Sequence, residues 1–203
     1  MDQDINPIFE RNVPGTTVIL QGSVIGIAGC GGLGSNAAIS LARAGAGKLI
    51  LADCDTVELS NLNRQAYFRT DVGKPKTEAL AEHLRSINPG IELILHQVEL
   101  TPDNLPETFS DADLLIEAFD RAESKKWLIQ TWCAENPDRP VIVGSGIGGL
   151  GKTGELKVHS SGNIHICGDE WSSSEEGLCA ARVSIVANMQ ANTAISLLTE
   201  LKG

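Results

Sequence analysis

The sequence predicts an α/β protein with a doubly wound, Rossmann-like, mostly parallel sheet, helices on both faces and an antiparallel extension near the C-terminus. Short apolar runs such as 24–28 and 48–52 alternate with helical stretches, which is the order of a parallel sheet. The first run ends in a glycine-rich turn, Gly29-Cys30-Gly31-Gly32-Leu33-Gly34, and a helix follows it. The second run ends in Asp53. This combination is typical of nucleotide-binding folds.

Strands and helices alternate regularly along the first 144 residues. One helix starts at the glycine turn, and the next starts at Gly73-Lys74-Pro75-Lys76. In chain order we expect strand 24–28, helix 34–44, strand 48–52, a nucleotide-binding loop at 53–73, helix 74–87, strand 92–97, strand 113–117, helix 121–135 and strand 141–144.

The texture of the sequence changes after the last of these strands. A glycine-rich joint at 145–151 leads into two short strands near Glu155–His159 and Asn163–Cys167, which we expect to extend the sheet antiparallel. Residues 168–177 are polar and acidic, and they predict a mobile loop. The last helix, 180–201, places apolar and small side chains near one face, which is the pattern of core packing.

Length and composition indicate one domain. With 203 residues, 42% of them hydrophobic, the chain can bury one sizeable core and is too short for a second enzymatic domain. Residues 1–22 are polar and contain proline, so we expect an N-terminal arm before a single domain at 23–203. No run approaches the roughly 20 apolar residues of a membrane span, and the N-terminus lacks the cationic start of a secretory signal. We therefore expect a cytoplasmic protein.

Charge and cysteine content restrict the possible partners and ligands. The formal net charge of −10 and the pI near 4.8 argue against nucleic acid or an anionic membrane, because these select basic surfaces. The five cysteines show no Cys-x-x-Cys spacing, so no structural zinc is expected. Cys167 and Cys179 flank the 168–177 loop. Either could attack an acyl-adenylate or carry a persulfide, and the alternative is that both are small buried hydrophobes.

The residues around the glycine turn favour a triphosphate. The turn presents backbone N–H groups and a helix N-terminus to a bound phosphate, and Asp53 can accept hydrogen bonds from ribose hydroxyls. Arg64 and Lys76 follow in the loop after the second strand and at the start of the next helix. A pyrophosphate bridge needs no such pair of cations, whereas three phosphates do. ATP is therefore favoured over NAD, and a purely structural role of the glycines remains the alternative.

Asp120 is the candidate magnesium ligand. It follows the apolar run Leu114-Leu115-Ile116-Glu117-Ala118-Phe119, at the carboxyl edge of the expected sheet, where open α/β folds bind ligands. Mg²⁺ prefers hard oxygen ligands of this kind. The alternative is that Asp120 caps the helix that starts near Arg121, and both roles could coexist.

Four motifs together resemble one family. They are the glycine turn, then Asp53-Cys54-Asp55, then Ser60-Asn61-Leu62-Asn63-Arg64-Gln65, then Gly73-Lys74-Pro75-Lys76. In order and spacing they resemble the ThiF/MoeB/HesA-type activators of ubiquitin-like proteins, from about residue 11 to residue 201. The short length, Cys167-Gly168-Asp169 and the segment 177–183 look most like a compact ThiF subgroup.

The resemblance implies an adenylyltransferase. Such proteins use ATP and Mg²⁺ to adenylate the C-terminal Gly-Gly carboxylate of a small ubiquitin-like sulfur carrier, and the subgroup points to a ThiS-like carrier of thiamin biosynthesis. It also implies a homodimer in which Arg11 could contact phosphate of the neighbouring subunit, and a crossover loop at 168–177 in which Trp171 contacts the carrier tail. The implied site comprises Gly29, Gly31, Gly32 and Gly34 in the turn, Asp53 for the ribose, Asn61, Arg64, Gln65 and Lys76 for the phosphates, and Asp120 for Mg²⁺, with Arg64, Lys76 and Asp120 carrying the catalysis.

Such a reaction needs no general base. An α-carboxyl group has a pKa of about 3.3 to 3.7, so the attacking carboxylate is already ionised at neutral pH and only its approach must be arranged. The four histidines form no close pair in the sequence and receive no chemical role: they are His83, His96, His159 and His165.

Three other functions stay open on the sequence alone. An activator of a molybdopterin-type or other sulfur carrier would show the same motifs. An NAD-dependent oxidoreductase shares the glycine turn and Asp53, but the chain lacks a substrate domain and an evident proton donor. A non-catalytic nucleotide-binding scaffold is opposed by the presence of Arg64, Lys76 and Asp120.

Overall fold

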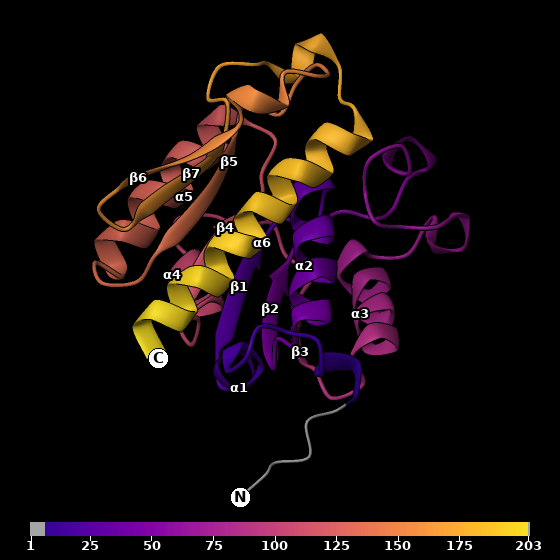
Figure 1. Ribbon diagram of the computed structural model, residues 1–203. Coiled ribbons are helices and arrows are strands. Elements are labelled where there is room, and N and C mark those ends of the chain that lie inside the picture. Colours follow the sequence, from indigo (N-terminus) through magenta and orange to yellow (C-terminus); the bar gives the residue numbers. More distant parts are fainter. Residues whose placement is uncertain (1–6, 203) are drawn as a thin grey trace, which may run out of the picture.

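The protein is built around one seven-stranded sheet. A computed structural model describes residues 7–202 (Figure 1). The strand order is β3-β2-β1-β4-β5-β7-β6, and all neighbouring pairs are parallel except the last. The strands are β1 (Val24–Ala28), β2 (Lys48–Ala52), β3 (Glu92–His96), β4 (Leu114–Glu117), β5 (Val141–Ser145), β6 (Lys157–Ser161) and β7 (Ile164–Gly168).

Helices cover both faces of this sheet, as the sequence predicts (Figure 1). Successive residues of β2 alternate between the two faces: Leu49 and Leu51 belong to the core with α2, α3 and α6, and Ile50 belongs to the core with α4 and α5. The helices are α1 (Thr16–Gln21), α2 (Gly32–Ala44), α3 (Lys76–Ile87), α4 (Leu105–Thr108), α5 (Ala122–Glu135) and α6 (Ala180–Lys202).

The strand order creates a crevice beside the first strand. The chain builds outward from β1 to β2 and β3, and it then returns to the other side of β1 with β4 and β5. Ligands of open α/β sheets bind at the carboxyl ends of the strands where the order reverses in this way. The glycine turn follows β1, Asp53 follows β2 and Asp120 lies three residues beyond the end of β4, so all three lie at this edge.

The C-terminal extension differs in one respect from the expectation. β7 pairs with β5 in parallel, with Val141 opposite Ile164, and only the outer strand β6 runs antiparallel to its neighbour. After β5 the chain first forms β6, at the edge of the sheet. A tight turn at Gly162 then reverses the chain, so that β7 lies between β6 and β5. The fold class predicted from the sequence is confirmed, and its antiparallel part consists of the β6–β7 pair.

Part of the expected N-terminal arm packs on the core. Phe9 is 3% exposed and Leu20, on the short helix α1, is fully buried. The Asn12 side-chain amide donates hydrogen bonds to Thr17 Oγ1 and to the Ala44 carbonyl oxygen at the end of α2, both at 2.9 Å. Residues 7–22 are therefore packed on the domain. The polar composition of this segment predicted an arm, but its Phe9 and Leu20 side chains are buried in the core. The first six residues lie outside the described part.

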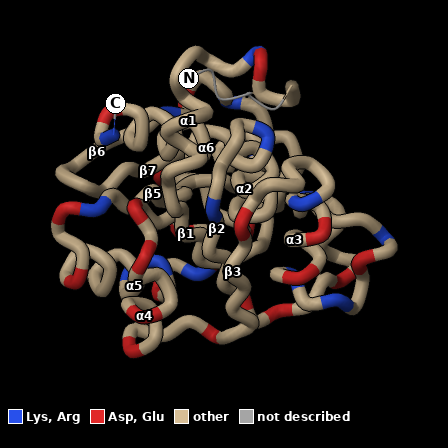
Figure 2. The backbone as a smooth tube through the Cα atoms, turned by 90° about the horizontal axis from the view of Figure 1, so that it is seen from below, with Lys and Arg blue, Asp and Glu red and all other residues tan. Residues whose placement is uncertain are grey.

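None of the helices in residues 7–202 has the length and apolarity needed to cross a membrane. The positions of basic and acidic residues are interspersed along the backbone, in helices and in loops (Figure 2).

Candidate active site

The glycine turn is held in a shape that admits only glycine at two positions. Gly29 has a φ of 97°, in the left-handed region. A Cβ at Gly34 would lie 1.8 Å from the Gly29 carbonyl oxygen, so the turn closes tightly against the first residues of α2. The N-cap residue of α2 is Gly31, and it offers no side-chain cap to the helix. The N–H groups of this helix N-terminus are therefore available to an anion.

Asp53 is fixed directly beside this turn. Its Oδ2 accepts a hydrogen bond from the Cys30 backbone N–H at 2.6 Å, and its Oδ1 accepts one from the Asp55 N–H at 2.8 Å. Burial raises the pKa of Asp53, although nearby Lys76 and these two hydrogen bonds oppose the shift. The carboxylate is oriented by the backbone, and each oxygen has a further lone pair that a ribose hydroxyl can use.

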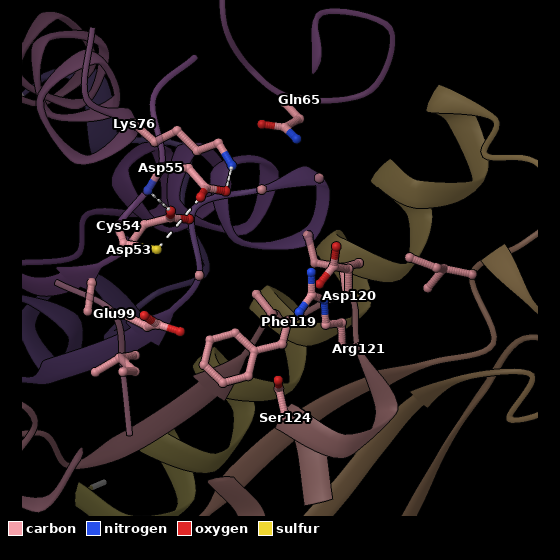
Figure 3. A pocket seen from close by; sticks show the side chains of 18 of the residues that line it. Asp53, Cys54, Asp55, Gln65, Lys76, Glu99, Phe119, Asp120, Arg121 and Ser124 are labelled. Atoms are coloured by element: carbon pink, nitrogen blue, oxygen red, sulfur yellow. Dashed lines mark hydrogen bonds and ion pairs between the residues drawn. The ribbon is translucent and has the colours of Figure 1, made fainter. Parts of the chain in front are cut away.

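Lys76 is buried at the first residue of α3 and paired with an acid. Its Nζ lies 2.6 Å from Asp55 Oδ2, and its side chain is 8% exposed. Burial works against its charge, but Asp53 and the hydrogen bond to Asp55 outweigh this and raise the Lys76 pKa above its ordinary value. The same hydrogen bond lowers the Asp55 pKa. Lys76 is therefore a permanently charged group near neutral pH, and Asp55 holds its ammonium at the cavity wall (Figure 3).

Arg64 approaches the turn from the loop after β2. One guanidinium nitrogen donates to Asn63 Oδ1 at 2.8 Å and to the Ser60 carbonyl oxygen at 3.4 Å. A Cβ placed on Gly32 would lie 3.6 Å from Arg64 Cγ, so the stem of this arginine runs alongside the first turn of α2. The stem thus lies beside the helix N-terminus, and the guanidinium is held by Asn63 and Ser60.

A cavity of about 430 Å³ connects these groups (Figure 3). The volume lies within the roughly 300 to 1,000 Å³ typical of small-molecule sites. The turn residues Gly29, Gly31 and Gly32 line it. So do five of the predicted side chains, which are Asp53, Arg64, Gln65, Lys76 and Asp120.

Two predicted residues do not line this cavity. Gly34 lies inside α2, where its role is the close contact with Gly29. The Asn61 carboxamide oxygen accepts a hydrogen bond from the Glu58 N–H at 3.0 Å and caps a short 3₁₀ helix, Leu59–Asn61. Asn61 thus shapes the loop that carries Arg64. The motif predicted that Asn61 lies in the loop after β2, and it does. The motif did not show that the Asn61 side chain turns to the Glu58 backbone instead of lining the cavity.

Gln65 has an unsatisfied atom at the cavity. The residue is 9% exposed, and its Oε1 is buried without a hydrogen-bond donor among the described residues. A buried carbonyl oxygen without a donor is costly, so a ligand or water at this wall would satisfy it. The side chain lies next to the glycine turn, since a Cβ at Gly31 would be 3.8 Å from Gln65 Nε2.

Asp120 lies at the opposite rim, beside Arg121 (Figure 3). The N-cap residue of α5 is Arg121, and no side-chain capping hydrogen bond is formed there. The capping alternative for Asp120 is therefore wrong, and its exposed carboxylate remains available to a cation. Mg²⁺ usually keeps several waters and binds proteins through one or two carboxylates plus substrate phosphates, which suits a single aspartate at a phosphate site.

An apolar wall completes the cavity, and the sequence reasoning missed it. Val98 and Leu100 follow β3, Phe119 follows β4 and Trp127 lies on α5. The Phe119 and Trp127 rings have centroids 5.7 Å apart. These residues provide a surface on which a flat nucleobase can pack. Apolar residues just beyond two strand ends were the signal that could have revealed this wall.

The 168–177 loop is organised by a buried ion pair that was also missed. Asp169 is fully buried, and Arg182 from the first turn of α6 donates a hydrogen bond to its Oδ2 and another to the Gly151 carbonyl oxygen, the latter at 2.7 Å. Asp169 Oδ1 accepts the N–H groups of Trp171 and Ser172 at 3.0 and 2.9 Å. The loop base is therefore fixed between the glycine joint and α6, while the Trp171 side chain is 62% exposed.

The two candidate nucleophilic cysteines differ in burial. Cys167 is fully buried, and burial raises the pKa of its thiol to about 11. A thiol in such a setting is a poor nucleophile, since the thiolate is the reactive form. Cys179 is partly exposed, and neither cysteine lines the cavity. Cys54 does line it, with its Sγ 3.6 Å from Asp55 Oδ1.

The fold and the cavity define a doubly wound α/β protein with a nucleotide-type site at the point where the strand order reverses. Comparison with known proteins gives the family. The chain belongs to the ThiF family, which it matches over residues 10–203. The resemblance stated from the motifs is thereby confirmed.

Individual relatives are adenylyltransferases. The chain is 33% identical to the sulfur carrier protein ThiS adenylyltransferase of Escherichia coli, over 87% of this chain and 72% of that protein. It is 44% identical to the adenylyltransferase and sulfurtransferase uba4 of Emericella nidulans, over 52% of this chain. The match spans only 22% of that longer relative.

A solved structure shares most of this architecture. The E. coli tRNA N6-threonylcarbamoyladenosine dehydratase TcdA, in complex with AMP, superimposes with a TM-score of 0.82 at 25% identity. The match covers 91% of this chain and 89% of that one. The same protein has also been solved in complex with ATP, with a TM-score of 0.78 at 26% identity.

Proposed function

We propose that this protein uses ATP to adenylate the C-terminal carboxylate of a small ubiquitin-like sulfur-carrier protein. The observation that carries the proposal is the convergence of the open glycine turn, Arg64 and Lys76 on one cavity. Two cations beside a helix N-terminus suit a triphosphate better than a dinucleotide. The identity to two ThiS adenylyltransferases, from E. coli and Bacillus subtilis, supports the same reaction.

The chain's own residues stabilise charge in this reaction. The carrier carboxylate attacks the α-phosphorus of ATP, the bond to the bridging oxygen breaks, and pyrophosphate leaves as the acyl-adenylate forms. Arg64 can bind phosphate oxygens with its planar guanidinium, and Lys76 acts as a point charge. The Lys76 ammonium can turn from Asp55 toward phosphate, so Asp55 keeps it charged and positioned before ATP arrives.

Magnesium belongs to this proposal through Asp120. The exposed carboxylate at the cavity rim is the group that would hold the ion. When bound, Mg²⁺ neutralises charge on the leaving pyrophosphate. Asp53 orients the ribose, and the wall of Val98, Leu100 and Phe119 receives the base.

The carrier and its pathway are the finer part of the proposal. We favour a ThiS-like carrier ending in Gly-Gly, and hence thiamin biosynthesis, because ThiS adenylyltransferases match 87% and 85% of this chain. A carrier of the molybdopterin or uba4 type is the alternative. The 168–177 loop, with the exposed Trp171, would cover the carrier tail. A cytoplasmic homodimer is part of the same proposal.

A tRNA-directed dehydratase is the second candidate. It is favoured by the structural match to TcdA over 91% of this chain. It is opposed by the formal net charge of −10, because tRNA binding selects basic surfaces.

ATP–pyrophosphate exchange tests the proposal. The purified protein is incubated with ATP, Mg²⁺ and labelled pyrophosphate, with a Gly-Gly-ended carrier, with the same carrier lacking its last two residues, or with tRNA. Exchange that needs the intact carrier supports the proposal. If neither form of the carrier supports exchange but tRNA supports ATP turnover, the protein is a tRNA-directed dehydratase. Binding of NADH without binding of ATP would indicate an oxidoreductase.

A further inference from the structure

His83 on α3 is held against the loop that carries Arg64 and Gln65. Its side chain is 15% exposed. Its Nδ1 lies 3.1 Å from the Ala66 carbonyl oxygen. Its Nε2 lies 3.0 Å from Asp71 Oδ2. The Phe68 ring covers it, with ring centroids 5.0 Å apart.

Both ring nitrogens of His83 face atoms that can only accept a hydrogen bond. The carbonyl oxygen of Ala66 and the carboxylate oxygen of Asp71 can each accept an N–H of the imidazole ring, so His83 can link both residues to α3. The Asp71 side chain is 4% exposed. The other charged groups nearby are Lys74, 3.8 Å from Asp71, and Glu82, which pairs with Lys74 at 2.6 Å.

The same short segment is tied on its other side to the glycine turn. The Ala66 N–H donates to Ser35 Oγ on α2 at 3.0 Å. The Tyr67 hydroxyl donates to the Cys30 carbonyl oxygen at 2.7 Å, with the Lys76 carbonyl oxygen 3.3 Å away. The loop carrying Arg64 is therefore held between α2 and α3, and both His83 and the Lys76 carbonyl oxygen contact it from α3.

We propose that His83, through its contacts with Ala66 and Asp71, is a positioning residue that holds the segment 64–71 so that Arg64 and Gln65 face the glycine turn. His83 does not line the cavity, so it acts through these residues. The expected effect of His83 on ATP binding rests on the proposed function. The immobilisation of residues 64–71 by His83 does not depend on it.

The variants His83→Ala, His83→Asn and His83→Gln separate the two contacts. The Asn amide nitrogen falls near the position of Nδ1 and can donate to Ala66. The Gln amide nitrogen falls near Nε2 and can donate to Asp71. His165→Gln is the matched control, because His165 lies on β7 and binds Ser160 away from the cavity.

ATP affinity is measured by calorimetry at neutral pH. Loss of a hydrogen bond to the Asp71 carboxylate predicts about tenfold weaker ATP binding by His83→Ala, with partial rescue by the Asn and Gln variants. The His165→Gln control should bind ATP like the wild type. Equal affinity of His83→Ala and wild type, or no rescue by either the Asn or the Gln variant, would overturn the proposal.

Amide hydrogen exchange keeps this test independent of the proposed function. His83→Ala should speed exchange at 64–71 and leave β1 and β4 unchanged. Unaltered exchange at 64–71 would overturn the positioning role even if ATP binds well. A wild type that does not bind ATP but shows the expected exchange pattern would refute the proposed function alone.

Discussion

Replacing Arg182 with methionine should leave a buried carboxylate without its cation. Asp169 is fully buried and Arg182 is 4% exposed, so neither water nor another described cation can take over the contact. Methionine fills a similar apolar volume but donates no hydrogen bond. The perturbation therefore tests whether this pair holds the base of the 168–177 loop to α6.

The size of the effect follows from the burial. Removing one partner of a buried ion pair costs about 3 to 5 kcal/mol. For a domain of 150 to 250 residues each kcal/mol lowers the melting temperature by about 2 to 4 °C, so Arg182→Met should melt about 6 to 20 °C lower. Adding Asp169→Asn should recover much of the loss, because asparagine removes the charge and can still accept the N–H groups of Trp171 and Ser172.

Thermal unfolding at neutral pH, followed by circular dichroism, measures this. Arg121→Met is the control, since the Arg121 side chain is exposed and forms no hydrogen bond or ion pair within residues 7–202. Hydrogen bonds from Ser172 and Trp171 and the Arg182 charge outweigh burial and lower the Asp169 pKa below 3.8. The stability from this carboxylate is complete above that value and is lost as pH falls through the folded-state pKa. A drop under about 2 °C in Arg182→Met, or no recovery in the double variant, would refute the reasoning.

Three further predictions concern the cavity and its loop. Arg64→Ala should slow carrier-dependent exchange about 100- to 1,000-fold at an unchanged melting temperature, and a rate near wild type would contradict its role. Gly34→Ala should lower the free energy of unfolding in urea by about 1 to 3 kcal/mol or more, because the new Cβ would clash with the Gly29 carbonyl oxygen. Gly31→Ala is the control: its Cβ would meet no atom closer than 3.8 Å, so its stability should be near that of the wild type. Trp171→Ala should raise the KM for the carrier without changing stability or the KM for ATP, and an unchanged carrier KM would argue against a covering loop.

Periodicity and turn chemistry predicted the elements that build the sheet. β1 and β2 begin and end where the apolar runs do, and α2 begins at the glycine turn, two residues before the expected start. These features are local, because strand length and helix start are determined by neighbouring residues. The short helices α1 and α4 were not expected, since each is stabilised by packing against distant parts of the chain.

The sequence predicted those site residues that directly follow a strand, because the end of the strand fixes where they lie. Asp53 and the turn glycines follow strands that end at one sheet edge, so the sequence could place them together. The direction of Asn61 and the burial of His83 depend on how the 59–73 loop folds back on α2 and α3. The Asp169–Arg182 pair joins a residue of the 168–177 loop to α6, and no spacing rule indicates that a loop aspartate turns inward.

The most direct test of the account is an experimental structure of the protein with a non-hydrolysable ATP analogue and Mg²⁺. We predict that the triphosphate lies over the glycine turn at the start of α2, with Arg64 and Lys76 in contact with its oxygens and the base against Phe119. A triphosphate bound elsewhere, or bound at the turn with Arg64 and Lys76 directed away from it, would contradict the central claim.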